Sequence, residues 1–220
     1  MRYDAVIFDM DGTVLDTLGD LTATLNHALS EFGYPPRTAE ETRSFIGNGV
    51  RMLLRRGAGE ELGDEKMGLM YKAFVEYYKD HLTDKTRPYD GIADLLKSLR
   101  EAGLRVALLS NKADFAVTVL CRMFFDGLFD LYYGEREGIP RKPDPAGAIA
   151  VMAELGVTPE RTLYVGDSGV DLATAHAADL DCVLVGWGYL NSEVELTPGR
   201  DLTAQTPEDV LKIALSEDRK

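Results

Sequence analysis

Short, unbroken runs of apolar residues most constrain how this chain can fold. They cover residues 5–8, 105–109, 162–165 and 182–185, with a weaker run at 129–133. Because these runs do not alternate between apolar and polar residues, they are typical of parallel strands buried on both faces. Between them, apolar residues recur at helical spacing, as in Ile92, Leu95, Leu96 and Leu99. The pattern predicts an α/β fold, with a Rossmann-like parallel sheet flanked by helices.

One segment, from about residue 18 to residue 83, breaks this alternation and contains no convincing strand. Its two apolar stripes have helical spacing, and the turn sequences Gly33-Tyr34-Pro35-Pro36 and Gly47-Asn48-Gly49 lie between them. The stripes are Leu18, Leu21, Leu25, Leu29 and Phe32, then Met67, Met70, Tyr71, Phe74 and Tyr78. We therefore expect a small inserted α-helical cap domain at residues 17–83, and an α/β core formed by residues 1–16 and 84–220.

Composition narrows the classes of partner. The 220 residues are 45% hydrophobic and 28% charged, as in ordinary soluble globular proteins. The net charge of −13 opposes binding to the phosphates of nucleic acid. The first apolar run is too short for a secretory signal, and no run approaches the roughly 20 residues of a membrane span. The two cysteines do not make a disulfide framework. We expect a cytoplasmic monomer or homodimer that binds neither nucleic acid nor membranes.

The first strand is followed directly by two carboxylates, in Asp9-Met10-Asp11-Gly12-Thr13. In an open α/β sheet, ligands bind beyond the carboxyl ends of the strands, so both acids lie where chemistry is expected. A calcium-binding EF-hand loop is excluded, since it needs an oxygen ligand and then a glycine where this chain has Thr13 and Val14.

Three further polar groups lie after or between the later strands. Ser110 and Asn111 end the second run, where a hydroxyl and amides at the start of a helix suit phosphate. Lys142 precedes a proline, so its backbone is extended and a loop can direct its side chain into a cleft. Asp167 and Asp171 follow the fourth run. Several carboxylates in one cleft repel one another unless a cation neutralises them, and oxygen ligands suit Mg²⁺.

In this order, the four motifs resemble those of the haloacid dehalogenase superfamily of phosphohydrolases. Those motifs are Asp-x-Asp-Gly-Thr, a Ser or Thr ending the second strand, a Lys before Pro, and Gly-Asp-x-x-x-Asp. The resemblance covers essentially the whole chain, and the helical segment is similar to the small cap of that superfamily. Within it, residues 45–49, 88–91 and 186–189 resemble phosphoglycolate phosphatases. The resemblance implies a Mg²⁺-dependent phosphatase of a small phosphate monoester, with 2-phosphoglycolate as the expected substrate.

The resemblance also implies a role for each motif residue. Asp9 would attack phosphorus and form an aspartyl-phosphate, while Asp11 would protonate the leaving oxygen and then deprotonate water. Phosphoryl oxygens would be held by Ser110 and Lys142, with the backbone amides of Gly12 and Asn111 adding to this. Mg²⁺ would be held by Asp9, Asp167, the backbone carbonyl of Asp11, and Asp171 directly or through water.

The cap is expected to decide the substrate. Gly47-Asn48-Gly49 precedes a helical pattern, so this loop presents free amides at a helix start. We expect the loop, assisted by Arg51, to bind a carboxylate of the substrate. A plain turn between helices with a solvated Arg51 is an equally open interpretation.

Other functions remain open at this point. A dehalogenase has no need for an acid two residues after its nucleophile, so Asp11 argues against one. An inorganic pyrophosphatase, or a sugar-phosphate phosphatase or mutase, would share all four motifs. A non-catalytic binding module on this fold would be marked by the loss of a motif residue, whereas every one is present.

Overall fold

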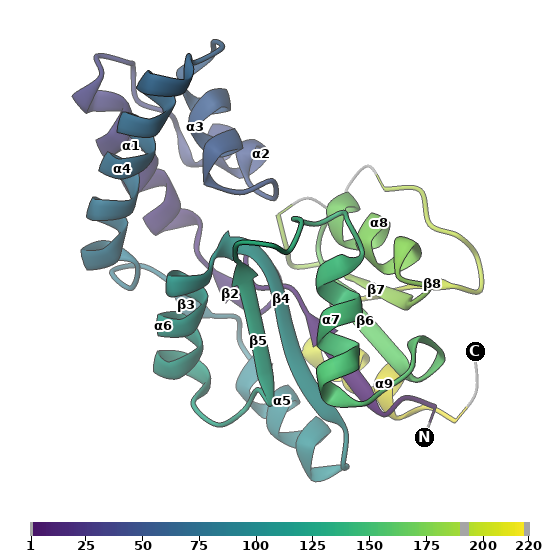
Figure 1. The fold of residues 1–220 in the computed structure, drawn as a ribbon. Helices are drawn as coiled ribbons and strands as arrows, with labels where there is room; N and C mark the ends of the chain where they lie inside the picture. Colours follow the sequence, from purple (N-terminus) through teal and green to yellow (C-terminus); the bar gives the residue numbers. More distant parts are fainter. Residues whose placement is uncertain (1, 190–193, 218–220) are drawn as a thin grey trace.

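The centre of the molecule is a parallel sheet. In the computed structural model, which describes residues 2–189 and 194–217, six strands lie in the order β5-β4-β1-β6-β7-β8 (Figure 1). The central strand β1 (Ala5–Phe8) pairs with β4 (Arg105–Ala113) and β6 (Thr162–Gly166). Outside these lie β5 (Leu131–Glu135), β7 (Asp181–Val185) and β8 (Asp201–Ala204), each parallel to its neighbour. The predicted α/β fold with a parallel sheet is confirmed.

Helices cover both faces of the sheet, and successive residues of β1 explain why. Val6 and Phe8 pack into one layer, and Ile7 into the other. The first layer contains α5 (Ile92–Glu101), α6 (Asp114–Phe125) and α9 (Pro207–Leu215). The second contains α7 (Ala146–Leu155) and α8 (Gly169–Ala177). A strand buried on both faces needs no polar side, which accounts for its unbroken apolar sequence.

Residues 18–81 form four helices that pack on one another apart from the sheet (Figure 1). They are α1 (Leu18–Glu31), α2 (Ala39–Phe45), α3 (Val50–Ala58) and α4 (Asp64–His81). The predicted stripes on α1 and α4 supply buried side chains at their interface, such as Leu25 and Phe74. We call this bundle the cap.

The chain enters and leaves the cap through an antiparallel ribbon of β2 (Leu15–Asp16) and β3 (Arg87–Pro88). The buried carboxylate of Asp20, at the start of α1, accepts hydrogen bonds from the amides of Lys85 and Thr86 at 2.8–3.1 Å. The two connections between cap and core are therefore fixed to each other next to this ribbon.

Three strands differ from the sequence prediction. Strand β5 begins at Leu131 rather than at Phe129, because Phe129 packs into the core before the strand starts. Strand β4 continues to Ala113, with a shift in register between Leu109 and Ala113, so Ser110 lies within the strand and not at its end. The edge strand β8 was not predicted. A single-turn 3₁₀ helix (Pro159–Arg161) precedes β6.

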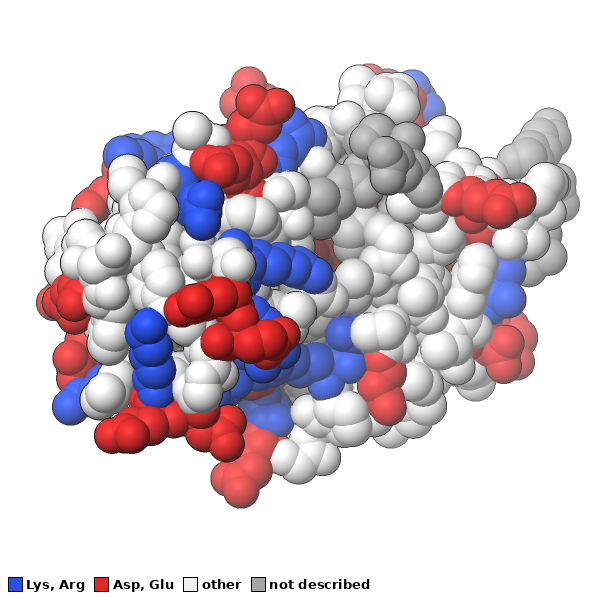
Figure 2. Space-filling model, turned by 90° about the horizontal axis from the view of Figure 1, so that it is seen from above, with Lys and Arg blue, Asp and Glu red and all other residues white. Residues whose placement is uncertain are grey.

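Charged side chains of both signs lie on the surface of the molecule. Figure 2 shows acidic and basic side chains intermingled on one face, with basic side chains along the boundary between the cap and the core. Among the described residues, no helix combines the length and the apolar character needed to cross a membrane.

Candidate active site

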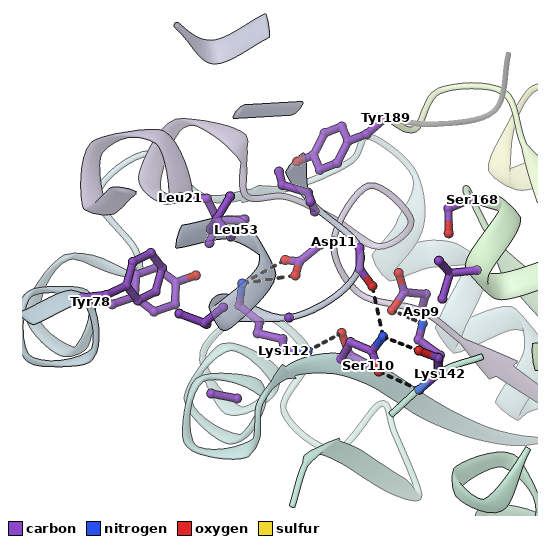
Figure 3. A pocket seen from close by; sticks show the side chains of 18 of the residues that line it. Asp9, Asp11, Leu21, Leu53, Tyr78, Ser110, Lys112, Lys142, Ser168 and Tyr189 are labelled. Atoms are coloured by element: carbon purple, nitrogen blue, oxygen red, sulfur yellow. Dashed lines mark hydrogen bonds and ion pairs between the residues drawn. The ribbon is translucent and has the colours of Figure 1, made fainter. Parts of the chain in front are cut away.

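One cavity lies between the strand ends of the core and the cap. The structure brings most of the predicted site residues to its wall, from β1, β4, the loop before α7 and the loop after β6 (Figure 3). They are Asp9, Asp11, Ser110, Asn111, Lys142 and Asp167. Parallel strands finish at the same edge of a sheet, which is why residues far apart in sequence meet here.

Lys142 is the cation at the centre of this wall. Its buried ammonium lies 2.7 Å from Oδ1 of Asp9 and 2.7 Å from Oδ1 of Asp171. Although burial opposes its charge, the Asp171 and Asp9 carboxylates hold the pKa of Lys142 well above its usual value. Lys142 therefore stays protonated and fixes the direction of the Asp9 side chain.

Three carboxylates form one buried acidic cluster. Asp9, Asp167 and Asp171 each offer an oxygen within 4.8 Å of the other two. Burial raises the pKa of Asp9 to about 7, although Lys142 opposes the rise. Burial raises the pKa of Asp167 as well, with the charges of Asp171 and Asp9 adding to the effect. Three carboxylates against one ammonium leave two negative charges uncompensated, and a divalent cation would balance them.

Glycines make room for this cluster. A Cβ on Gly12, which has a φ of 88°, would lie 2.2 Å from Oδ2 of Asp167, and one on Gly188 would lie 2.2 Å from the Asp167 Cβ. The amide of Gly12, expected to help bind phosphate, donates here to the carbonyl of Leu15 at 3.0 Å. In this structure Gly12 thus contributes space for Asp167 rather than a phosphate donor.

Asp171 is largely engaged by the protein. Its Oδ1 accepts from Lys142, and its Oδ2 accepts from the amide and hydroxyl of Ser168 at 3.1 and 2.6 Å. Ser168 and Asp171 form the capping box of α8, which locks the start of that helix. Asp9 and Asp167 are consequently the better placed pair for direct contact with a cation, with Asp171 behind them.

Asp11 lies apart from the acidic cluster and has different partners. The Lys112 ammonium is 2.9 Å from its Oδ1 and 3.3 Å from its Oδ2, and the Thr17 hydroxyl donates to Oδ1 at 2.7 Å. Thr17 is the N-cap residue of α1, so the position of Asp11 is tied to the first residue of the connection into the cap.

Asn111 connects three parts of the site. Its side-chain amide donates to the carbonyls of Lys142 at 2.9 Å and of Gly47 in the cap at 3.0 Å. Its Oδ1 accepts from the Lys142 amide at 2.8 Å. The sequence suggested Asn111 for its backbone amide, whereas the structure also gives its side chain the task of holding the Lys142 loop and the cap loop together.

Only some of the cap residues expected to bind the substrate lie at the cavity. Gly47 and Gly49 line the cavity, as expected for a substrate loop, but Asn48 and Arg51 do not. The Asn48 side chain accepts from Arg56 at 2.9 Å, and the exposed Arg51 stacks on the ring of Tyr71 at 5.1 Å. The expectation that Arg51 points to the substrate is not supported by this position, because its guanidinium packs on the cap itself.

The sequence analysis assigned no role to three residues at the site. Lys112 and Tyr78 line the cavity, and Arg43 of α2 reaches from the cap to the loop after β7. Arg43 donates to the carbonyls of Tyr189 and Gly188 at 2.7 and 2.8 Å. Lys112 directly follows the Ser110-Asn111 motif, and this adjacency was the one signal available for it.

Most of the chain, including the four motifs, matches a known protein family. Residues 6–185 match the family described as haloacid dehalogenase-like hydrolase. The chain belongs to this family. The expected family and hydrolase class are thereby confirmed.

Individual proteins of the family are similar over most of the chain. Phosphoglycolate phosphatase 1 of Pseudomonas aeruginosa is 38% identical over 190 residues, which cover 84% of this chain and 70% of that protein. N-acetylmuramic acid 6-phosphate phosphatase of the same species is 30% identical over 223 residues, covering 97% and 95%. A crystal structure from Lactobacillus delbrueckii subsp. bulgaricus, provisionally assigned as a phosphoglycolate phosphatase, superposes with a TM-score of 0.86 at 35% identity. It covers 99% of this chain and 100% of that one.

Proposed function

We propose that this chain hydrolyses 2-phosphoglycolate, with Mg²⁺ as its cofactor and an aspartyl-phosphate as the intermediate. The family match and the phosphatase relatives make it a phosphate monoester hydrolase. The observation that carries the proposal is the convergence of Asp9, Asp11 and Lys142 on one small cavity that the cap covers.

Asp9 is the nucleophile in this proposal. Its carboxylate is held by Lys142 and opens on the cavity, as an attacking group requires. In the first step, an Asp9 oxygen forms a bond to phosphorus while the bond from phosphorus to the ester oxygen breaks. Lys142 and the Ser110 hydroxyl hold the phosphoryl oxygens, on which the transition-state charge is spread, and the amide of Asn111 adds to them.

Asp11 moves the protons. It gives a proton to the departing ester oxygen in the first step, so that the alcohol leaves neutral at that atom. In the second step it takes a proton from water. The water oxygen bonds to phosphorus, the bond to Asp9 breaks, and inorganic phosphate leaves. Asp11 pairs with Lys112 and Asp9 with Lys142, so the two carboxyl groups have separate partners for their separate roles.

The donor set fits Mg²⁺. Asp9 and Asp167 would hold the cation with the backbone carbonyl of Asp11, and Asp171 would act behind them. When bound, the cation would neutralise the clustered carboxylates and the charge on the phosphoryl group. Without it, the raised pKa values of Asp9 and Asp167 would leave part of the nucleophile protonated at neutral pH.

The size of the cavity favours a short leaving group. The cavity has a volume of about 50 Å³, enough for only a few waters. Apolar side chains of the cap close the far side, among them Leu21, Leu53 and Phe74. A sugar phosphate, such as the substrate named for the N-acetylmuramic acid 6-phosphate phosphatase, would need the cap to open wider.

A panel of phosphate esters tests the assignment. Phosphate release would be measured with Mg²⁺ and with EDTA for 2-phosphoglycolate, N-acetylmuramic acid 6-phosphate, a hexose phosphate and pyrophosphate. We expect kcat/KM for 2-phosphoglycolate to exceed the others by about 100-fold or more. EDTA should abolish activity, and Asp9→Asn should lower it roughly 10³-fold or more on every ester. A preference for another ester would replace the substrate, while full activity of Asp9→Asn would refute the mechanism.

A further inference from the structure

Two polar side chains of the cavity are not used by the mechanism above. Lys112 comes from β4 of the core, and Tyr78 comes from α4 of the cap. Figure 3 shows them facing each other on the Asp11 side of the cavity, away from Lys142. The Lys112 ammonium lies 5.0 Å from the centre of the Tyr78 ring. This pair therefore lies where the leaving group, rather than the phosphoryl group, would be bound.

Lys112 is a buried cation with a single carboxylate partner among the described residues. Its side chain is 3% exposed, and its ammonium pairs with Asp11. Although burial opposes its charge, Asp11 holds the pKa of Lys112 above its usual value. Asp11 takes up only part of the three N–H donors of this ammonium, so an anion of the substrate can accept from the rest.

Tyr78 supplies an unused donor beside this cation. The residue is 2% exposed, and its hydroxyl makes no hydrogen bond to any described residue. Burial raises the pKa of Tyr78 to about 12, so the hydroxyl keeps its proton at neutral pH. A buried hydroxyl without a partner is costly, and a ligand oxygen in the cavity would satisfy it.

The surroundings define what this pair can bind. Leu21, Leu53 and Phe115 line the same cavity, whose small volume requires the anion to be small. Because the ammonium is 2.9 Å from Asp11, and Asp11 must reach the ester oxygen, the anion must lie very near that oxygen. A carboxylate attached directly to the ester carbon meets both conditions.

We propose that Lys112 and Tyr78 bind the carboxylate of the leaving group, so that the site selects phosphate esters of short 2-hydroxy acids. The proposal rests on the proposed function and names the residues that give it specificity. Selectivity for the carboxylate lies in Lys112 of the core, completed by Tyr78 when the cap is closed, rather than in Arg51.

Two pairs of esters isolate the carboxylate. Ethyl phosphate differs from 2-phosphoglycolate, and isopropyl phosphate from 2-phospholactate, only by a methyl group in place of the carboxylate. For Lys112→Met, we expect kcat/KM to fall about 100-fold or more on the acidic esters and about 10-fold or less on the neutral ones. Tyr78→Phe should lower it roughly 10-fold on the acidic esters only. Lys112→Arg keeps the charge and should retain most of the preference.

Control variants separate this role from a structural one. Lys72→Met removes an exposed lysine from the same helix as Tyr78 and should change no substrate. Arg51→Met should leave the preference for acidic esters unchanged. Thermal unfolding midpoints of all the variants would show that each one folds.

The outcomes distinguish the two proposals. An equal loss on acidic and neutral esters in Lys112→Met would mean that Lys112 only positions Asp11, and would overturn the inference. A selective loss in Arg51→Met would overturn it as well. If the wild type rejects 2-phosphoglycolate but prefers 2-phospholactate, the substrate assignment fails and the subsite is then decided on the second pair. If the wild type prefers neither acid, both proposals fall.

Discussion

The two walls of the cavity are built in different ways. On the core wall, ion pairs and hydrogen bonds connect four residues that follow strands β1, β5 and β6 in the chain: Asp9, Lys142, Asp167 and Asp171. On the cap wall, apolar side chains predominate, and Tyr78 contributes a hydroxyl without a partner among the described residues. The side chains of the core wall therefore hold one another in position without a substrate, whereas Tyr78 on the cap wall has a hydroxyl that a substrate oxygen could bind.

This difference separates chemistry from choice of substrate. The geometry of the core wall follows from the order of parallel strands, which places every strand end at one edge. The geometry of the cap wall depends on how a helical bundle docks on that edge through contacts such as Asn111 to Gly47. Substitutions of Asp9, Lys142, Asp167 or Asp171 should therefore affect the reaction with every ester. Substitutions in the cap, and of Lys112 where the core faces Tyr78, should affect substrate binding.

Among the predictions that test this difference between the two walls, Asp11→Asn should have the largest effect on kcat. Without a general acid, kcat for 2-phosphoglycolate should fall about 10²–10⁴-fold, since its leaving oxygen needs a proton. With p-nitrophenyl phosphate, whose leaving group needs no proton, the first step should survive while hydrolysis of the aspartyl-phosphate slows. We expect a burst of p-nitrophenol, equal to the enzyme concentration, in rapid-mixing measurements.

The control for this experiment is Asp94→Asn, which removes an exposed carboxylate from α5 and should leave kcat unchanged. Steady turnover of Asp11→Asn without a burst would show that its first step is also impaired. The second-step role of Asp11 would then lose its support.

The same contrast explains how much the sequence could predict. Strand β1 was predicted residue for residue and β6 and β7 to within one residue, because unbroken apolar runs mark strands buried on both faces. Strand β8 was missed because it is a four-residue edge strand, Asp201–Ala204, that mixes polar and apolar residues. The prediction was thus best where burial is complete and weakest at the edge.

Site residues were also predictable only where the sequence marks a strand end. Asp9, Asp11, Lys142 and Asp167 could be placed in one cleft because each is close to the end of a strand. Lys112 could not be recognised, since its burial depends on a cap tyrosine 34 positions earlier and on Asp11. Arg51 was expected near the substrate for its place after the glycine loop, but the face of α3 on which it lies is turned to Tyr71.

Arg43→Ala tests the cap wall with a smaller effect. Arg43 holds the cap to the carbonyls of Gly188 and Tyr189, so its loss should reduce the population of the closed cap. Since the residue is largely exposed, we expect KM for 2-phosphoglycolate to rise roughly 3- to 10-fold, with kcat changing less.

Arg55→Ala is the matched control, because Arg55 pairs with Glu61 inside the cap and, among the described residues, donates no hydrogen bond to the core loop that Arg43 contacts. It should leave KM unchanged. A fall in kcat with constant KM in Arg43→Ala would mean that Arg43 acts on the core wall, through the loop that holds Asp167 at Tyr189.

The smallest predicted effect concerns stability and the acidic cluster of the core wall. The pKa of Asp9 is about 7 in the folded chain, against about 3.9 for an unperturbed aspartate. Between these pH values the folded state binds more protons than the unfolded one, so the contribution of Asp9 to the free energy of unfolding falls as the pH rises towards 7.

Asp9→Asn removes the free-energy cost of a buried, ionised Asp9 and leaves Lys142 paired with Asp171. In EDTA, the melting temperature of Asp9→Asn relative to the wild type should therefore increase by roughly 2–6 °C between pH 5 and pH 8. Mg²⁺ should reduce this difference by stabilising the wild type more. The melting temperatures would be measured by calorimetry, with Asp94→Asn as the control. A difference that stays constant with pH would mean that burial does not raise the pKa of Asp9, and that the cluster does not need a cation for its stability.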